Sequence, residues 1–227
     1  MKADAARSGK KGRRRKIVVH IATSADGYIA RPDGNIDWLT SRPAPKGFYG
    51  IAAFQRTIDT ILLGRKTFDL SLELGATFGG RTRSYVFSRR PPPASLPRGV
   101  EFVSEPIERF VTRLRERMGK NVWMMGGGDL IASFLDAGAI DEFIVSIVPV
   151  FIGEGIPLIA PRHREQQLSL HSVKPFPDGV VQVHYEIRTG EATRRQRRGA
   201  ADRGRSSAAG KPPRRSSKRI RSSWKGW

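Results

Sequence analysis

The sequence of 227 residues contains no cysteine, which excludes disulfide bonds, thiolate zinc sites and cysteine nucleophiles. No apolar run approaches the roughly 20 residues that a membrane-spanning helix needs. The basic stretch from Met1 to Lys16 is not followed by the apolar region of a signal peptide. We therefore expect a cytoplasmic protein without a membrane partner.

Histidine is also scarce, and the four histidines do not form a metal-binding pattern. His20 and His184 fall in strand-like segments, whereas His163 and His171 fall in a polar connection. Because metal sites take their ligands from short, regular spacings, these positions favour structural histidines. We expect no metal site.

Acidic residues are nearly absent from the two ends of the chain. Of the net charge of +20, the segment from Lys16 to Arg188 carries only +3, since it holds 21 lysines and arginines against 18 aspartates and glutamates, and the two flanks carry +17. Such polar, charged flanks cannot bury enough apolar surface to fold. This division predicts a globular domain over residues 16–189 with basic, disordered tails at 1–15 and 190–227.

The tails admit three interpretations. Lysine and arginine alone suffice for nonspecific, salt-dependent contact with nucleic acid. A solvated extension without function, or a translated accident in a gene of high GC content, is equally compatible with the sequence. The charge of the tails therefore does not define the function of the domain between them.

Strand-like and helix-like patterns alternate within the domain. Short apolar segments predict strands at residues 17–22, 60–63, 85–87, 122–125, 143–150 and 180–187. Helical spacing predicts helices from Ile107 to Met118 and from Leu130 to Ala137, the second one ended by Gly138. A third helix is expected through Phe68 and Leu72. This alternation is typical of an α/β fold with a mixed, mostly parallel central sheet and helices on both faces. Strands after Asp141 have no helices between them, so the C-terminal edge should be antiparallel.

Two glycine elements follow predicted strands and precede predicted helices. Gly64-Arg65-Lys66-Thr67 offers a helix amino terminus and two cations to a phosphate, although a tight turn with a solvated basic pair explains it equally well. In Gly126-Gly127-Gly128-Asp129, successive glycines let the backbone approach a pyrophosphate, without the spacing of a Rossmann fingerprint. A single glycine would suffice for the turn, which favours the ligand-binding interpretation of the second element.

A third element, Thr23-Ser24-Ala25-Asp26-Gly27-Tyr28-Ile29, ends the first predicted strand, where Asp-Gly alone indicates a simple turn. All three elements lie at the carboxyl ends of strands, where open α/β sheets bind ligands. We therefore expect them to converge on one edge of the sheet.

The order of these motifs resembles the dihydrofolate-reductase-like superfamily. The motifs are Ser-x-Asp-Gly after the first strand, Asp37-Trp38, Asp59 to Leu63 leading into Gly-Arg-Lys-Thr, a strand ending at Ser88-Arg89, and Gly-Gly-Gly-Asp at the head of a helix. Within the superfamily, the chain is similar to the reductase domain of the bacterial bifunctional riboflavin-biosynthesis deaminase-reductase and to its stand-alone relatives. The resemblance spans nearly all of residues 16–188.

The resemblance implies an NADPH-dependent reductase and gives each motif a role. Thr23 would lie near the nicotinamide, and Trp38 would line the mouth between cofactor and substrate. The rest of the cofactor would be held by Gly64, Arg65, Lys66, Thr67, Ser88, Arg89, Gly126, Gly127, Gly128 and Asp129. The cations Arg65 and Lys66 favour NADPH over NADH, because the additional 2′-phosphate needs a charged partner.

Two departures from the family patterns concern the substrate. Dihydrofolate reductases carry a carboxylate on the helix after the first loop, where this chain has Phe48-Tyr49, which argues against folate reduction. The riboflavin-pathway reductases carry a glutamate where this chain has Met125. We expect a small heterocyclic or sugar-linked substrate, in its most specific form the riboflavin precursor 5-amino-6-(5-phosphoribosylamino)uracil.

Asp26 and Asp37 are the acids nearest the expected hydride-transfer site. They are the candidate proton donors, directly or through water, although turn-capping roles suit their positions at least as well. The loop Gly153-Glu154-Gly155 would lie near the cofactor by resemblance and would otherwise be a hairpin turn.

We also expect a homodimer, because the segment from Phe143 to Phe151 is too apolar for a free sheet edge. The alternative to a reductase is a noncatalytic protein that binds nucleic acid through its tails. That alternative leaves the three glycine elements unexplained, so we favour the reductase.

Overall fold

The structure is a computed structural model that describes residues 14–43 and 48–188. The chain divides into two units after Ile187, and all of the elements below belong to the first unit. The predicted tails lie outside the described residues, apart from Arg14 and Arg15.

Strands and helices alternate along the first two thirds of the described chain. The strands are β1 (Ile17–Ser24), β2 (Tyr28–Ala30), β3 (Ile58–Gly64), β4 (Arg83–Phe87), β5 (Val100–Val103), β6 (Asn121–Gly126), β7 (Glu142–Val148), β8 (Ile156–Pro157), β9 (Leu168–Pro175) and β10 (Val181–Ile187). The helices are α1 (Asp37–Thr40), α2 (Ile51–Gln55), α3 (Arg65–Glu73), α4 (Ile107–Glu116) and α5 (Gly128–Asp136), with a short 3-10 helix, η1 (Phe48–Gly50).

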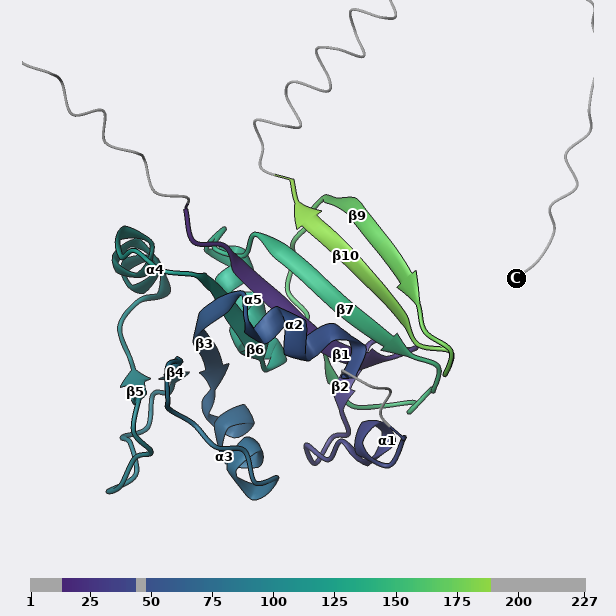
Figure 1. The fold of residues 1–227 in the computed structure, drawn as a ribbon, viewed down its shortest axis with the longest axis horizontal. Coiled ribbons are helices and arrows are strands. Elements are labelled where there is room, and N and C mark those ends of the chain that lie inside the picture. Colours follow the sequence, from purple (N-terminus) through teal and green to yellow (C-terminus); the bar gives the residue numbers. More distant parts are fainter. Residues whose placement is uncertain (1–13, 44–47, 189–227) are drawn as a thin grey trace, which may run out of the picture. The chain divides into compact units, whose positions relative to one another are not determined.

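One sheet organises these elements, in the strand order β5-β4-β3-β6-β1-β7-β10-β9 (Figure 1). Neighbours from β5 to β7 run parallel, whereas β10 is antiparallel to both β7 and β9. β2 and β8 form a separate pair. The structure confirms the predicted fold, a mostly parallel sheet with an antiparallel C-terminal edge.

Alternation of side chains along the strands explains why helices cover both faces. In β1, Val19 joins a buried cluster that includes Phe134 of α5. The next residue, His20, faces the other side and stacks on Phe54, directly before the end of α2, with ring centroids 4.6 Å apart. Both faces of the central strands are therefore apolar, which is why they appear in the sequence as continuous apolar runs.

The three predicted helices are confirmed as α3, α4 and α5, and the ends of α4 and α5 are shifted. α4 stops two residues before Met118, whose side chain is 85% exposed, and α5 begins at Gly128. Gly138, with φ +60°, follows α5 as expected of a helix stop. No helix among residues 14–43 and 48–188 is long and apolar enough to cross a membrane.

The predicted position of β7 at a free edge is wrong. β7 is paired with β1 on one side and with β10 on the other, so the apolar segment that starts at Phe143 is covered within the chain. The sequence patterns do not predict β9, which forms the edge beyond β10. The two edges of the sheet are β5 and β9, and Leu170 and Val173 of β9 are 58% and 53% exposed, so β9 rather than β7 is the edge with exposed apolar side chains for a second copy to pair with.

Candidate active site

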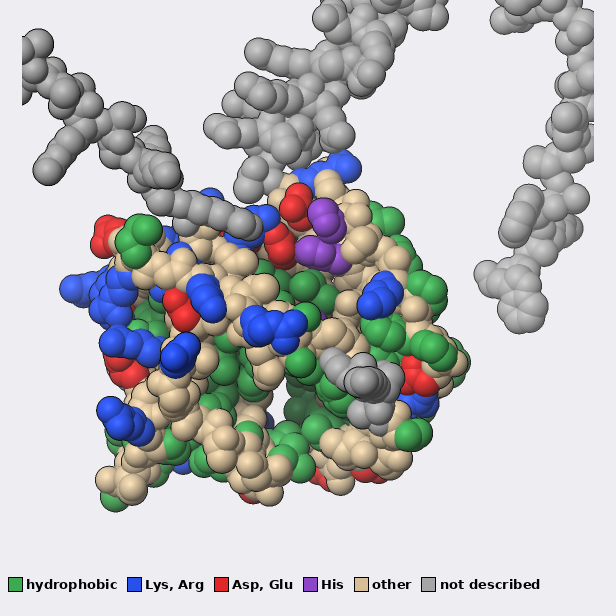
Figure 2. All heavy atoms as spheres, viewed as in Figure 1, with side chains coloured by type: hydrophobic (Ala, Val, Ile, Leu, Met, Phe, Trp, Pro, Cys, Tyr) green, Lys and Arg blue, Asp and Glu red, His purple; other side chains and the backbone are tan. Residues whose placement is uncertain are grey.

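The three glycine elements meet at one edge of the sheet, as predicted. β1, β6 and β3 are adjacent and parallel, so their carboxyl ends lie side by side. A Cβ atom placed on Gly64 would lie 3.8 Å from the backbone nitrogen of Gly127, and one placed on Gly126 would lie 3.5 Å from Ile21 Cδ1. Figure 2 shows the surface hollowed between the side that carries α3 and the side that carries β2 and α1.

Two helices begin at this edge. α3 and α5 are nine residues long, and their N-cap residues, Gly64 and Gly127, make no side-chain capping bond. The two starts face one another, since a Cβ atom on Gly127 would lie 3.4 Å from Thr67 Oγ1. The first N–H groups and the positive dipole ends of both helices are thus directed at one place, which we call the glycine cradle. The cradle has the donors that a pyrophosphate requires.

The four glycines at the cradle differ in whether their backbone conformation or their close contacts require a glycine. Gly126 has φ +122°, and a Cβ atom on Gly128 would lie 2.3 Å from the Pro157 carbonyl oxygen, so the fold itself requires these two. The argument that one glycine suffices for the turn is therefore wrong. Gly64 and Gly127 have φ of −78° and −85°, and a methyl group on either would make no contact shorter than 3.4 Å. Neither a positive φ nor a contact shorter than 3.4 Å explains why these two lack a side chain.

Arg65 and Lys66, the predicted cations of the Gly64–Thr67 element, differ in whether an acidic side chain pairs with them. Arg65 Nε lies 2.8 Å from both carboxylate oxygens of Asp69, and its guanidinium lies 5.5 Å from the centre of the Phe102 ring. Lys66 is exposed, with no ion pair to any described residue. The charge of Arg65 is thus partly neutralised, and Lys66 is the freer cation.

Ser88 and Arg89, which the resemblance places on the adenosine side of the cofactor, lie in the turn after β4, and Asp129, which it places at the pyrophosphate, lies at the start of α5. Ser88 Oγ accepts a hydrogen bond from the Arg90 N–H at 3.0 Å, which fixes the turn after β4, and Arg89 is exposed in that turn. Asp129 is exposed in the first turn of α5, where its negative charge interacts favourably with the helix dipole. Its carboxylate would repel a phosphate, so only its backbone suits the predicted role.

Asp26 connects the loop between β1 and β2 to the loop after β7 through hydrogen bonds. Its Oδ2 accepts hydrogen bonds from the Ile152 N–H at 3.1 Å and from the Gly153 N–H at 2.8 Å. Hydrogen bonds from the Ser24 hydroxyl and from these backbone groups lower the pKa of the carboxyl. The structure thus brings the predicted loop at Gly153 to Asp26, which serves there as an ionised acceptor.

Asp37, the other candidate acid, is paired with a neighbour. Arg31 Nε donates to its Oδ1 at 2.7 Å, and the N–H of Trp38 donates to the same oxygen at 2.8 Å. The bond from Arg31 lowers the pKa of Asp37. Its place at the start of α1 is the position of a helix-stabilising acid.

Trp38 is buried, at 6% exposure, in a cluster with Tyr49, Val148 and Val180. Its indole nitrogen is a buried donor with no acceptor among the described residues. Buried donors are almost always paired, so this N–H is available to a group outside the described residues.

A carboxylate contacts Tyr49, although the sequence around Phe48-Tyr49 carries no acid. The hydroxyl of Tyr49 donates a hydrogen bond to Asp178, which lies in the turn between β9 and β10. Burial, followed by the nearby Asp178, raises the pKa of Tyr49, and the bond lowers the pKa of Asp178. Arg42 donates to the Asp178 carbonyl at 2.9 Å. The Asp-Gly turn at residue 178 is the only local signal for this group.

His20 lies between the sheet and α2. Its backbone carbonyl accepts a hydrogen bond from Trp123 Nε1 at 2.9 Å, and Phe54 stacks on its ring. Burial lowers the pKa of His20 to about 4. The imidazole is therefore neutral near pH 7, as expected of a structural histidine.

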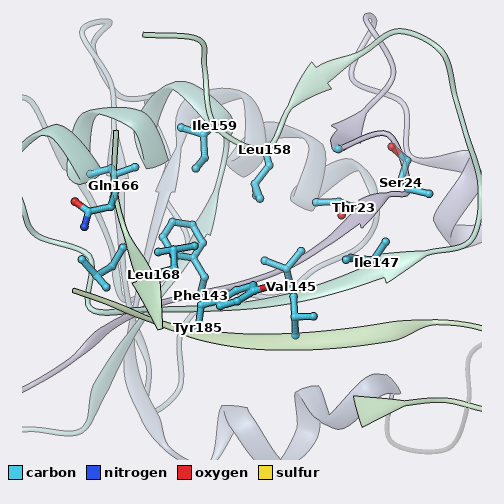
Figure 3. Close-up of a pocket in the computed structure, with 15 residues that line it drawn as sticks. Thr23, Ser24, Phe143, Val145, Ile147, Leu158, Ile159, Gln166, Leu168 and Tyr185 are labelled. Atoms are coloured by element: carbon cyan, nitrogen blue, oxygen red, sulfur yellow. The ribbon is translucent and has the colours of Figure 1, made fainter. Parts of the chain in front are cut away.

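Thr23 opens onto a separate pocket of about 330 Å³ on the α5 side of the sheet. Figure 3 shows Thr23 and Ser24 at one end, Phe143 and Tyr185 along the sheet, and Leu158 across from them. Its walls are mostly apolar. The predicted Thr23 is thus buried, at 3% exposure, at the junction of this pocket and the end of β1.

Comparisons with known proteins agree with this geometry. Residues 15–182 match the model of the RibD C-terminal domain. The chain is 39% identical over 172 residues to the uncharacterized protein YwjB of Bacillus subtilis (strain 168), an alignment that covers 75% of this chain and 97% of that protein.

Two solved structures show the fold. A putative riboflavin biosynthesis protein from Shewanella sp. PV-4 superimposes with a TM-score of 0.66 at 26% identity, covering 77% of this chain and 99% of that one. Dihydrofolate reductase from Enterococcus faecalis, complexed with NADP(H), superimposes with a TM-score of 0.53 at 15% identity, covering 77% and 97%. Since the family model covers well over half of the sequence, the chain belongs to the RibD C-terminal domain family, and it has a dihydrofolate-reductase-like fold.

Proposed function

We propose that this protein is a cytoplasmic NADPH-dependent reductase that transfers a hydride to a C=N or C=O group of a small heterocyclic or sugar-linked molecule. The observation that carries the proposal is the glycine cradle. Gly64 and Gly127 leave space between two helix amino termini that the fold does not require, and a pyrophosphate fits that space and its donors.

The residues of the chain suit NADPH in particular. Lys66 and Arg65 begin α3, directly beside the cradle, where a 2′-phosphate would need a cation. Lys66 is free to pair at once, whereas Arg65 has to exchange its bond with Asp69. Arg89, exposed after β4, adds a third cation on this side. NADPH, when bound, supplies the hydride.

The substrate side offers polar groups in an apolar setting. Trp38 presents a buried indole N–H, and the pair of Tyr49 and Asp178 presents a carboxylate that could accept from ring N–H groups. Donors and acceptors of this kind suit a pyrimidine ring. Membership of the RibD C-terminal domain family supports a riboflavin-pathway pyrimidine, such as 5-amino-6-(5-phosphoribosylamino)uracil, as the substrate.

The chain's own contribution to the reaction is orientation. The cradle fixes the phosphates, and the hydrogen bonds of Asp26 to Ile152 and Gly153 hold together the two loops at the end of β1. Because Asp26 and Asp37 have lowered pKa values, we propose that they position loops and water, and that the proton comes through water.

The test is a substrate panel in which NADPH absorbance is followed with the full-length protein. We expect oxidation of NADPH with the aminouracil ribosyl phosphate, whose sugar is reduced, and none with dihydrofolate. Absence of turnover on every heterocycle, together with absence of NADPH binding, would overturn the proposal. Binding without turnover would leave the cofactor assignment and reject the substrate class.

A further inference from the structure

A second pocket, of about 410 Å³, lies at the opposite ends of the strands from the cradle. Four arginines and a single acid line it: Arg15, Arg81, Arg83, Arg117 and Asp59. Thr60, on the pocket wall, pairs with Arg83 where β3 and β4 begin. Gly64 lies four positions after Thr60 in β3, about 13 Å at the rise of an extended strand. The arginine pocket is therefore distinct from the cofactor site.

The single acid of the pocket is fully occupied. Asp59 pairs with Arg15 and accepts hydrogen bonds from Thr60 Oγ1 and from the Lys120 N–H, each at 2.8 Å. Arg15 is only 6% exposed and also donates to the Lys120 carbonyl at 2.7 Å. Gly119 closes over this pair, since a Cβ atom there would lie 2.6 Å from Asp59 Oδ2. Asp59 is thus held by Arg15 and does not neutralise the other three arginines.

Those three arginines have no acidic partner among residues 14–43 and 48–188. No carboxylate of the described chain lies within 4.0 Å of the guanidinium nitrogens of Arg81, Arg83 or Arg117. Figure 2 shows lysine and arginine side chains gathered on the side of the molecule where α4 lies. Three unpaired cations around one hollow repel each other and attract an anion with several charges.

The floor of the pocket supplies both a donor and an apolar surface. Arg117 Nη1 donates to the hydroxyl oxygen of Tyr85 at 3.2 Å, which leaves the phenolic hydrogen free to donate. Leu114 and Met118 add apolar surface beside Tyr85. A volume of this size is in the usual range for pockets that hold small molecules.

We propose that the arginine pocket binds a small organic anion with two or more phosphate charges, held by Arg81, Arg83 and Arg117, with its uncharged part against Tyr85 and Met118. Guanidinium groups bind phosphate oxygens through paired N–H donors, which is the geometry that such an anion requires. This site is independent of the reductase chemistry.

Met118 gives a local signal for binding. The sequence has four methionines, and only Met118 lines this pocket, whereas Met125 lies at the end of β6 near the cradle. The full-length protein, labelled at its methionine methyl groups, is titrated with inorganic pyrophosphate and then with ADP while the methyl NMR signals are followed. Met118→Leu assigns the signal.

We expect a saturable shift of the Met118 signal, and Arg83→Gln or Arg81→Gln should raise the dissociation constant by about ten-fold or more, the loss of a charge-assisted bond. Arg109→Gln is the matched control, because Arg109 is exposed on α4 and does not line the pocket. An unchanged Met118 signal would overturn the proposal, as would a shift of Met125 alone. Equal weakening by Arg109→Gln would show diffuse attraction to the basic surface and would also overturn it.

Discussion

Replacing Gly64 with alanine should weaken cofactor binding and leave the fold intact. The backbone at Gly64 has φ −78° and ψ 161°, an extended conformation that alanine adopts freely, and the new methyl would lie 3.8 Å from the Gly127 nitrogen and 3.9 Å from the Gly126 oxygen. Alanine stabilises by about 0.4–1 kcal/mol by restricting the unfolded chain. It loses a comparable amount, about 0.5–1 kcal/mol, because it is a poorer N-cap than glycine. The melting temperature should therefore move by less than about 2 °C.

The loss of binding follows from the position of the same methyl group. It would stand between the starts of α3 and α5, where a phosphate oxygen has to approach the helix N–H groups. Losing one hydrogen bond to a charged group costs about 1.5–3 kcal/mol. We expect NADPH to bind about 10-fold to 150-fold more weakly, as measured by calorimetric titration.

Gly138→Ala is a control, because it should lower the stability of the protein and leave NADPH affinity unchanged. Gly138 has φ +60° with no atom within 4 Å of an added Cβ, at the far end of α5. Alanine in this left-handed conformation should cost about 1–2 kcal/mol of unfolding free energy, with NADPH affinity unchanged. If Gly64→Ala bound NADPH as tightly as the unchanged protein, the cofactor would not cross the cradle and the reasoning would be refuted.

Four further predictions follow from the described residues. Arg65→Ala should lower the preference for NADPH over NADH by about 1.5 kcal/mol. This is the low end of the range for a charge-assisted hydrogen bond, because the Asp69 carboxylate competes for Arg65. An unchanged ratio of the two dissociation constants would contradict this prediction. The pKa of His20 is lowered from 6.5 to about 4, so the unfolded state binds the proton more tightly than the folded state. Protonation of this group should therefore remove about 3 kcal/mol of stability as the pH falls from 6.5 to about 4. Urea unfolding of His20→Gln should show a dependence of stability on pH that is weaker by that amount. Sedimentation should show a dimer that Leu170→Lys on β9 converts to monomer, and a monomer at micromolar concentration would reject the dimer. Removing residues 1–13 and 189–227 should abolish retention on heparin at moderate salt without weakening NADPH binding; retention by the trimmed protein would locate the nucleic-acid affinity in the domain.

The sequence was most informative where local chemistry and strand ends coincide. Glycines follow the apolar runs of β3 and β6, and they predicted the starts of α3 and α5. Because parallel strands bring their carboxyl ends to one edge of the sheet, the sequence also predicted that these two helix starts lie close together. The apolar run of β7 predicted a covered strand but not its neighbours. Periodicity reports how many faces of a strand are buried, and it does not report which strands lie beside it, so the expected edge was wrong.

Contacts between residues far apart in the sequence could not be predicted from local patterns. Tyr49 and Asp178 are 129 positions apart, and nothing near Tyr49 indicates that an acid approaches it. The same holds for Arg15, which the charge pattern assigned to a tail, although its side chain is buried against Asp59. A charge run predicts a solvated segment on average, and it cannot identify the one member that is paired inside the fold. A truncation that leaves the fold intact therefore has to keep Arg15.

Transfer of deuterium tests the proposed reductase most directly. NADPH labelled with deuterium at the transferred position of the nicotinamide is incubated with the full-length protein and the aminouracil ribosyl phosphate, and the product is analysed by mass spectrometry. We expect a reduced product that carries the deuterium, formed by the unchanged protein and much more slowly by Gly64→Ala. A reduced product without deuterium, or no product while NADPH remains intact, would contradict hydride transfer from NADPH to this class of substrate.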